Sequence, residues 1–460
     1  MYHVGVRPLR FTISLILICA FPLLAEREKV LKQIDLPHHY YYREMYLPQL
    51  TSGPSSVSWS TDSTEVVYSM AGSLWRQRLD SETAVQLTSG PGYDYQPDWS
   101  PDGKWIVFTR YDRDAVELQI LEVATGLVRS LTSGGAVNVE PKWSPDGKKI
   151  AFVSTMDTKH FHVFAADFTD GNLTNASQLI KEQKSDLNRY YYSAFDHEIN
   201  PTWSPDSTEI IFVSNRGHIH GTGGFWRMKV GAGAREIRYE ETSWKARPDW
   251  SPDGKRVVYS SYLGRQWNQI WIMTSEGGDP FPLTYGEFDN TAPRWSHDGK
   301  KIAYISNRNG NTSLWIQDGI GAHLRQIEVS ERKYLHPMGT IKLMILDSEG
   351  KPASARVSIT GEDGRAYSFG MMHADDSFDR TERPFEAHYV HSSGESLTAV
   401  PAGKVTIDVL KGFEHEFERR EVALSADKTE KVEVQLRKLP MPASWRDWIS
   451  ADLQDRKSVV

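Results

Sequence analysis

One phrase, Trp-Ser-Pro-Asp-Gly-Lys, recurs through the first two thirds of the chain and limits what it can fold into. Intact copies begin at Trp99, Trp143 and Trp250, and altered copies begin at three further tryptophans. The six repeat tryptophans are Trp59, Trp99, Trp143, Trp203, Trp250 and Trp295. Self-similarity on this scale is the signature of a repeat architecture, so the phrase has an architectural meaning before it has any other.

The chemistry of the phrase explains why it recurs. Pro presets φ for the second position of a type I turn, Asp suits the third, and Gly tolerates the left-handed conformation that ends a tight hairpin. We therefore expect a strand to run into each Trp, reverse over the turn, and leave as an apolar strand. Each Trp should pack against the neighbouring repeat. The turn aspartates should cap the hairpin backbone and take no part in catalysis.

The spacing of the repeats predicts the fold. The six tryptophans lie 40, 44, 60, 47 and 45 residues apart, which is about the length of a four-stranded propeller blade. Every repeat except the first carries Pro two residues before Trp, which suits an innermost strand. We therefore predict a six-bladed β-propeller over residues 50–333. The preceding segment, 26–49, is expected to supply a strand to the last repeat and so close the ring.

These repeats resemble the TolB-like, WD-repeat-like propellers found in TolB and in the N-terminal part of many exported hydrolases. The resemblance covers about residues 45–333, with all six tryptophans present and three Ser-Pro-Asp-Gly turns intact. It implies a propeller fold and says little about function, because one fold serves many activities.

A second domain is predicted after a linker at residues 334–339. Over 340–438 the Trp phrase disappears and short segments alternate apolar with polar residues, which favours an Ig-like antiparallel β-sandwich. The phrases at Gly350-Lys351-Pro352-Ala353 and at Val400-Pro401-Ala402-Gly403 resemble the carboxypeptidase-regulatory-like sandwich. In particular, they are similar to the version that stands before the catalytic domain of exported CehA/McbA-type metallohydrolases of the PHP class. The predicted fold class is therefore all-β throughout.

The CehA/McbA resemblance also implies what should follow the sandwich. In such proteins a Trp-containing linker leads to Gly-Asp-Leu-His-x-His, whose histidines begin a metal site. Here Asp452-Leu453 fits this pattern, but Gln454 stands at the first His position. We interpret residues 439–460 as a truncated linker to a missing domain, and 455–460 as an artefact that matches a translated sequencing adapter. No cofactor is expected in this chain, and a divalent metal is expected only in the missing C-terminal domain.

The N-terminus predicts export. Arg7 and Arg10 precede an apolar run at residues 11–24, and Ala25 suits the residue before a cleavage site, so residues 1–25 are read as a signal peptide. The run is too short to favour a permanent membrane span. The predicted location is periplasmic or extracellular. The net charge is −7, without a block of basic residues, which argues against nucleic acid as a partner.

Catalytic motifs are missing from the sequence, and binding candidates are few. There is no G-x-S-x-G nucleophile elbow, and we assign no catalytic, cofactor or metal residues. Two His-x-His pairs, His160 with His162 and His218 with His220, are metal candidates, each lacking an evident third ligand. The 60-residue spacing marks an insertion that either binds a ligand or covers the channel. The candidate ligand-loop residues are Tyr190, Tyr191, Tyr192 and His197.

Together these features predict a non-catalytic, exported binding and scaffold module. The resemblance implies that it is the accessory N-terminal part of a larger secreted metal-dependent hydrolase, amidohydrolase- or PHP-like, whose active-site domain is absent. One alternative is a TolB-type module for protein contact in the envelope, and another is a propeller that gates a prolyl-oligopeptidase-like peptidase. The expected partner is a protein, peptide or small-molecule ligand at the propeller face. No oligomeric state is predicted.

Overall fold

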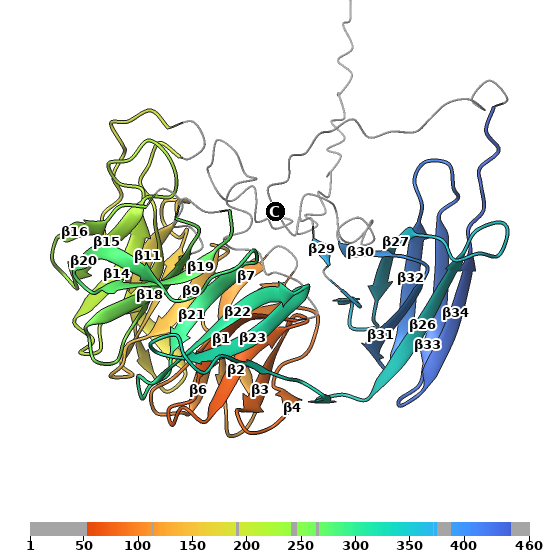
Figure 1. The fold of residues 1–460 in the computed structure, drawn as a ribbon, viewed down its shortest axis with the longest axis horizontal. Coiled ribbons are helices and arrows are strands. Elements are labelled where there is room, and N and C mark those ends of the chain that lie inside the picture. Colours follow the sequence, from red (N-terminus) through yellow and green to blue (C-terminus); the bar gives the residue numbers. More distant parts are fainter. Residues whose placement is uncertain are drawn as a thin grey trace, which may run out of the picture.

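The computed structural model is all-β, as predicted, with a ring of six antiparallel sheets beside a smaller two-sheet sandwich (Figure 1). The predicted signal peptide, the 26–49 segment and the adapter-like residues 455–460 lie outside the described residues. No helix in the described part of the chain is long and apolar enough to cross a membrane. The structure describes residues 53–112, 115–189, 193–240, 246–263, 266–370, 372–374 and 388–442.

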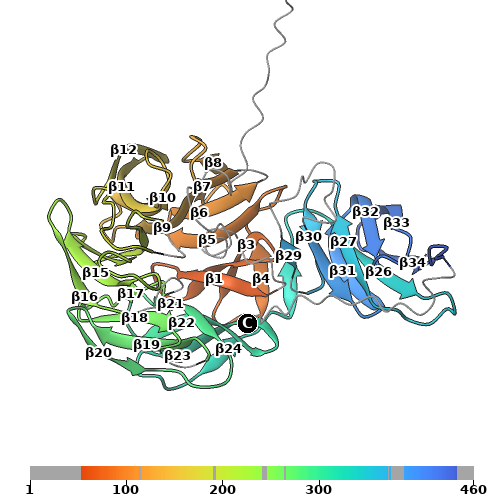
Figure 2. The ribbon, with the colours of Figure 1, turned by 90° about the horizontal axis from the view of Figure 1, so that it is seen from above.

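Six sheets of four consecutive strands form the blades of a propeller (Figure 2). Blades one and two are β1 (Pro54–Trp59), β2 (Glu65–Met70), β3 (Ser73–Arg78), β4 (Thr83–Gln86), and β5 (Tyr93–Trp99), β6 (Trp105–Asp112), β7 (Ala115–Glu122), β8 (Val128–Ser130). Blades three and four are β9 (Asn138–Trp143), β10 (Lys149–Ser154), β11 (His162–Thr169), β12 (Asn172–Gln178), and β13 (Glu198–Trp203), β14 (Glu209–Ser214), β15 (Gly224–Lys229), β16 (Ala234–Arg238). Blades five and six are β17 (Asp249–Trp250), β18 (Arg256–Ser261), β19 (Gln269–Thr274), β20 (Gly277–Pro282), and β21 (Asn290–Trp295), β22 (Lys301–Asn309), β23 (Asn311–Asp318), β24 (Arg325–Ile327).

The Ser-Pro-Asp-Gly turns adopt the predicted geometry. In the second blade Ser100 Oγ donates to Asp102 Oδ1 at 2.7 Å, and the Lys104 N–H donates to the same oxygen at 3.0 Å. Gly103 has φ +75°, a conformation that Gly adopts without strain. The turn aspartates of the other blades accept equivalent bonds from the Ser two residues before them. Their structural role is confirmed.

The repeat tryptophans pack between blades, as expected. All six are buried, with exposed fractions between 1% and 7%. Trp99 belongs to a core cluster with Val67 and Leu74 of the first blade, and Trp295 clusters with Val258 and Ile270 of the fifth. Each such Trp therefore joins its own blade to the preceding one, and the ring is held together by repeated apolar contacts.

The innermost strands of four blades carry a β-bulge beside the proline that stands two residues before the repeat Trp. In the second blade the register shifts between Tyr95 and Asp98, and Gln96 between them has φ +53°. The third, fourth and sixth blades show the same shift. A bulge tolerates Pro because it needs no ladder N–H there. The prediction that these prolines stand in or at the start of innermost strands is confirmed, with Pro248 directly before β17.

The ring closes between the first and sixth blades. The Trp59 indole N–H donates to the Arg294 carbonyl at 3.0 Å, and Trp59 packs with Ala303 of the sixth blade. The sixth blade takes its outermost strand, β24, from residues that follow β23, while β25 (Glu331–Lys333) pairs in parallel with β4 of the first blade. The ring-closing strand predicted from residues 26–49 falls in a part of the chain that the structure does not describe.

The second domain is a sandwich of a three-stranded sheet, β31-β26-β34, and a six-stranded sheet, in which β29-β30-β27-β32-β33 lie in this order and β28 pairs with β27. Its strands are β26 (Met338–Leu346), β27 (Ala355–Thr360), β28 (Ala366–Tyr367), β29 (His373–Ala374), β30 (His388–Ser392), β31 (Glu395–Pro401), β32 (Gly403–Leu410), β33 (Glu418–Leu424) and β34 (Thr429–Gln435). Alternate residues of β26 are buried, as the sequence pattern predicts. The predicted linker, 334–339, extends two residues too far, because Met338 and Gly339 already belong to β26 and pair with β31.

Arg365 fastens the sandwich to the propeller. Its side chain is buried, and its guanidinium donates to Ser73 Oγ at 3.0 Å and to the Ala71 carbonyl at 3.1 Å. It also lies 5.2 Å from the ring centroid of Tyr93. A Cβ at Gly72, which has φ +74°, would stand 2.1 Å from an Arg365 nitrogen, so only glycine allows this approach. The contact lies on the first blade, at the propeller face opposite the Ser-Pro-Asp-Gly turns.

Candidate functional site

The wide end of the central channel, hereafter the channel mouth, opens on the face that carries the Ser-Pro-Asp-Gly turns. It encloses about 290 Å³, and its walls include the six repeat tryptophans and prolines of the turns. The residue directly before each repeat Trp also lines it. These residues are Ser58, Asp98, Lys142, Thr202, Asp249 and Arg294.

Two carboxylates and two cations meet in the channel mouth. Arg294 forms an ion pair with Asp98, and its Nε lies 3.2 Å from an Asp249 carboxylate oxygen. Lys142 Nζ lies 3.9 Å from Asp98. Burial, followed by the nearby negative charge of Asp98, raises the pKa of Asp249 well above its ordinary value. Perturbed ionisable groups in a cleft are a feature of binding and catalytic sites.

Four of these six lining residues also tie neighbouring blades together. Asp98 Oδ2 accepts the backbone N–H of Trp143 at 2.7 Å, and Asp249 Oδ2 accepts the backbone N–H of Trp295 at 2.7 Å. Ser58 and Thr202 accept the equivalent bonds from the next Trp. The side chains of Lys142 and Arg294 have no acceptor atom, so they interrupt this pattern. The two cations of the mouth therefore stand where the repeat departs from its own rule.

Below the mouth the channel narrows to a waist of about 40 Å³. It is lined by the positive-φ bulge residues, among them Gln96, Glu140, Asn200 and Arg247. The backbone N–H and the side-chain amide of Asn200, in the fourth blade, each donate to Glu140 of the third blade at 2.7 Å. The waist has room for water but not for a ligand, so the mouth is a pocket with a nearly closed floor.

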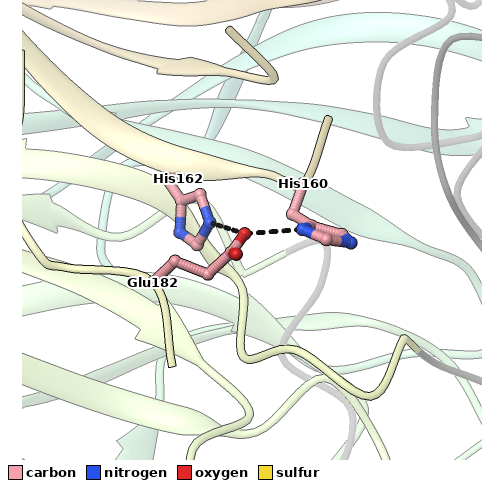
Figure 3. Close-up of side chains that lie close together, drawn as sticks. All are labelled: His160, His162 and Glu182. Carbon is pink, nitrogen blue, oxygen red and sulfur yellow. Dashed lines mark hydrogen bonds and ion pairs between the residues drawn. The ribbon is translucent and has the colours of Figure 1, made fainter. Parts of the chain in front are cut away.

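A histidine–glutamate cluster lies at the opposite face, between the third and fourth blades. His162 opens β11 beside Ser154 at the end of β10, far from the turn of that blade. His160 Nδ1 lies 2.6 Å from Glu182 Oε2, and His162 Nε2 lies 3.3 Å from the same oxygen (Figure 3). Glu182 belongs to the insertion after β12. One donor atom from each of the three side chains lies within 4.8 Å of the others, a spacing that suits a metal ion.

A second carboxylate stands behind this cluster. Glu198, the first residue of β13, faces His162 Nδ1 at 2.6 Å, and both side chains are buried. Burial acts to lower the pKa of His162, but its bonds to Glu198 and Glu182 outweigh burial and raise it. Burial raises the pKa of Glu198. For Glu182, hydrogen bonds from His160 and His162 overcome burial and lower the pKa.

The structure separates the other candidates predicted from sequence. His218 Nε2 lies 2.7 Å from Glu236, and the His218 ring stacks on Tyr239. His220 is exposed and belongs to no cluster of possible metal ligands among the described residues. His197 was expected in a ligand loop but is buried, with Nε2 3.0 Å from the Thr222 carbonyl oxygen, and burial lowers its pKa to about 3. Its burial follows from its position directly before β13, whose first residues are all buried. Tyr190, Tyr191 and Tyr192 lie outside the described residues.

Sequence reasoning missed the acidic partners and the mouth. Glu182 lies twenty residues beyond His162 in an insertion without a pattern, so no local signal connects them. The mouth residues did carry a signal. Alignment of the six repeats places Asp98, Lys142 and Arg294 at one equivalent position, directly before Trp.

Six four-stranded antiparallel blades around one channel define the class of protein as a six-bladed β-propeller. The chain belongs to the TolB beta propeller domain family, whose model matches residues 42–188 and 196–378. The TolB-like part of the resemblance is thereby confirmed. The likeness of the sandwich to carboxypeptidase-regulatory-like domains, and of the chain to CehA/McbA-type enzymes, stays a prediction.

Solved structures with a similar fold include TolB itself. TolB from Acinetobacter baumannii has a TM-score of 0.46 and 19% identity, covering 64% of this chain and 68% of that one. A putative TolB from Agrobacterium tumefaciens has a TM-score of 0.42 and 18% identity, covering 54% and 84%. The tricorn protease has a TM-score of 0.46 and 14% identity, covering 83% and 36%. No curated protein matches the chain significantly.

Proposed function

We propose that this chain is a non-catalytic, exported binding and scaffold module that takes its ligand in the channel mouth. The observation that carries the proposal is the pocket itself. It encloses about 290 Å³ above a narrow waist, with tryptophan walls and a few charged groups that converge on it. Pockets with mainly apolar walls and a few placed polar groups are the usual sites for small ligands.

The charges of the mouth indicate the chemistry of the ligand. Arg294 and Lys142 can meet a carboxylate, and Asp98 and Asp249 can meet a cationic or hydrogen-bonding group. Because two acids face two bases, a small zwitterion or the end of a peptide fits better than a strongly charged polymer. The ligand is therefore a protein terminus, a peptide or a small molecule, and not nucleic acid.

The scaffold role rests on the contact at Arg365. A buried guanidinium with two hydrogen bonds to the propeller supports a fixed distance between the two domains. We extend the proposal with the CehA/McbA resemblance: the chain acts as the accessory part of a larger secreted, metal-dependent hydrolase of the amidohydrolase or PHP-like kind. In that setting the propeller, in the periplasm or outside the cell, presents substrate, and the sandwich spaces it from the active site.

The test is a binding screen of the purified chain against dipeptides and small zwitterions, in which tryptophan fluorescence reports binding. We expect binding that Arg294→Gln weakens by about tenfold or more, because a charge-assisted hydrogen bond to the ligand is lost. Lys300→Gln, an exposed turn lysine of the same blade, is the matched control and should leave affinity unchanged. Hydrolase assays with added zinc or manganese should give nothing above buffer.

Three results would contradict the proposal. Absence of binding across the panel removes the pocket as a ligand site of this class. Equal affinity in Arg294→Gln and the parent chain moves the ligand away from the mouth. Turnover that stays with the chain through purification overturns the non-catalytic assignment.

A further inference from the structure

We propose that His160, His162 and Glu182 bind one divalent transition-metal ion, with Zn²⁺ as the best fit, and that this ion fastens the insertion to the third blade. The proposal is independent of ligand binding in the channel mouth, which lies on the other face. It starts from three side chains of the right types, whose donor atoms lie within 4.8 Å of one another.

The distances require little rearrangement. Zinc binds imidazole nitrogen and carboxylate oxygen at about 2.0–2.2 Å, so tetrahedral ligand atoms stand about 3.3 Å apart. His162 Nε2 and Glu182 Oε2 already lie 3.3 Å apart, and His160 Nδ1 lies 2.6 Å from the same oxygen. In Figure 3 both rings direct these nitrogens toward the one carboxylate. The two imidazole nitrogens lie within 4.8 Å of each other, and lengthening the 2.6 Å contact by about 0.7 Å gives the tetrahedral separation.

The residues behind the cluster prepare His162 as a ligand. Its Nδ1 faces Glu198 at 2.6 Å, in a position where both side chains are buried. A histidine ligand usually donates its second ring N–H to a carboxylate, which fixes the tautomer and aims the other nitrogen at the metal. Glu198 supplies this carboxylate, and it is held in turn by Arg216, 3.6 Å away.

His162 stands between two carboxylates, and a single oxygen of Glu182 faces both histidines. The His160 ring stacks on Phe195. A divalent cation at this oxygen would contact both imidazoles and balance Glu182, while Arg216 pairs with Glu198. Two imidazoles and one carboxylate form a donor set that zinc uses with a fourth, exchangeable ligand.

The metal would connect parts of the chain that the repeat does not connect. His160 and His162 come from the β10–β11 connection and the start of β11, while Glu182 comes from the insertion. Within the insertion, the Ser185 N–H donates to the Ala194 carbonyl and the Asp196 N–H donates to the Gln183 carbonyl. Its Arg189 guanidinium donates to backbone carbonyls that follow β14 of the fourth blade. A bond from Glu182 through the ion would tie this unit to the blade.

The test uses the full chain without a histidine tag, stripped with a chelator and titrated with Zn²⁺ by calorimetry. We expect one ion per chain and a rise in Tm when zinc is added, because the ion binds only the folded state. Glu182→Gln keeps the side-chain shape, removes the anionic ligand, and should weaken zinc binding by about tenfold or more. His218→Ala removes a histidine that pairs with a glutamate elsewhere and should bind zinc like the parent chain.

The outcomes separate the alternatives. Circular dichroism shows whether Glu182→Gln is folded; if it is not, Glu182→Asp and the visible spectrum of the Co²⁺-loaded parent chain, with the intense bands of a four-coordinate site expected, take its place. Absence of stoichiometric zinc in the folded parent chain overturns the proposal. So do equal affinity in the folded glutamate variant, loss of binding in His218→Ala, or a weak six-coordinate cobalt spectrum.

Discussion

The two faces of the propeller differ in how they use the repeat. On the turn face every blade contributes the same positions, and the channel mouth is built from the residue before each Trp. On the opposite face the histidine–glutamate cluster joins a strand start to an insertion that occurs once. The repeat therefore forms the propeller scaffold, and the candidate binding groups lie where the repeat is interrupted.

The breaks are of two kinds. Lys142 and Arg294 break the rule by substitution, since they place cations where other blades place hydrogen-bond acceptors to the next Trp. The insertion breaks it by length, since it adds Glu182 to the edge of the third blade. Substitution gives up the side-chain bond to the backbone N–H of the next Trp, whereas insertion leaves the blade intact. Variants at the two kinds of position should therefore differ in their effect on stability.

The largest expected effect is at a position that obeys the repeat. Trp59→Ala should lower the free energy of unfolding by about 3–5 kcal/mol, because it empties a buried site at the ring closure. Trp226→Ala, at a third-strand tryptophan that lies outside the six turn phrases and is only half-buried, is the control and should cost clearly less. Urea unfolding with comparable m-values measures both. Equal losses would mean that the repeat tryptophans have no special place in the ring.

An intermediate effect is expected where substitution breaks the repeat. Lys142→Ser would give the Trp203 N–H an acceptor like Ser58, whose Oγ accepts the Trp99 N–H at 3.1 Å. We expect a gain of up to about 1 kcal/mol in the free energy of unfolding, the net value of one hydrogen bond. The same change removes a cation from the mouth and should weaken ligand binding.

Ser58→Ala is the counterpart of that variant. It deletes an existing acceptor and should cost about 0.5–1.5 kcal/mol. Urea unfolding measures the free energy of unfolding of both variants. If Lys142→Ser is destabilised as much as Ser58→Ala, an acceptor at the position before Trp does not stabilise the contact between blades.

The same distinction explains what could be predicted from sequence. The fold followed from a local phrase, because the Trp, the turn and the apolar strand lie within about ten residues of one another. The mouth could have been predicted, since the repeats align and position 294 differs in charge from position 58. Glu182 and Arg365 could not, because each meets partners from distant segments without periodicity. The burial of His197 could not be predicted either, because an insertion gives no sign of which residues turn inward.

The smallest expected effect contrasts two aspartates with opposite pKa shifts. Hydrogen bonds from Ser204 and Thr208 lower the pKa of the turn residue Asp206 below its ordinary value of 3.8. Its ionised form is therefore favoured by folding, and this stabilisation is present above pH 3.8 and lost as the pH falls through the lowered pKa. Asp206 is exposed, so Asp206→Asn should cost only about a few tenths of a kcal/mol at pH 7 and less at pH 3.

Asp249 in the mouth should behave in the reverse sense. Its pKa is raised by burial and by Asp98, so folding favours the protonated form, and stability is lost as the pH rises from 3.8 through the raised pKa. Relative to the parent chain, Asp249→Asn should therefore become more stable with rising pH, and Asp206→Asn less stable. Urea unfolding of the three chains from pH 3 to pH 7 measures both trends. If both variants changed in the same direction with pH, the turn and the channel mouth would shift the pKa of their carboxylates in the same direction. That result would contradict the proposed difference between the repeated turns and the channel mouth.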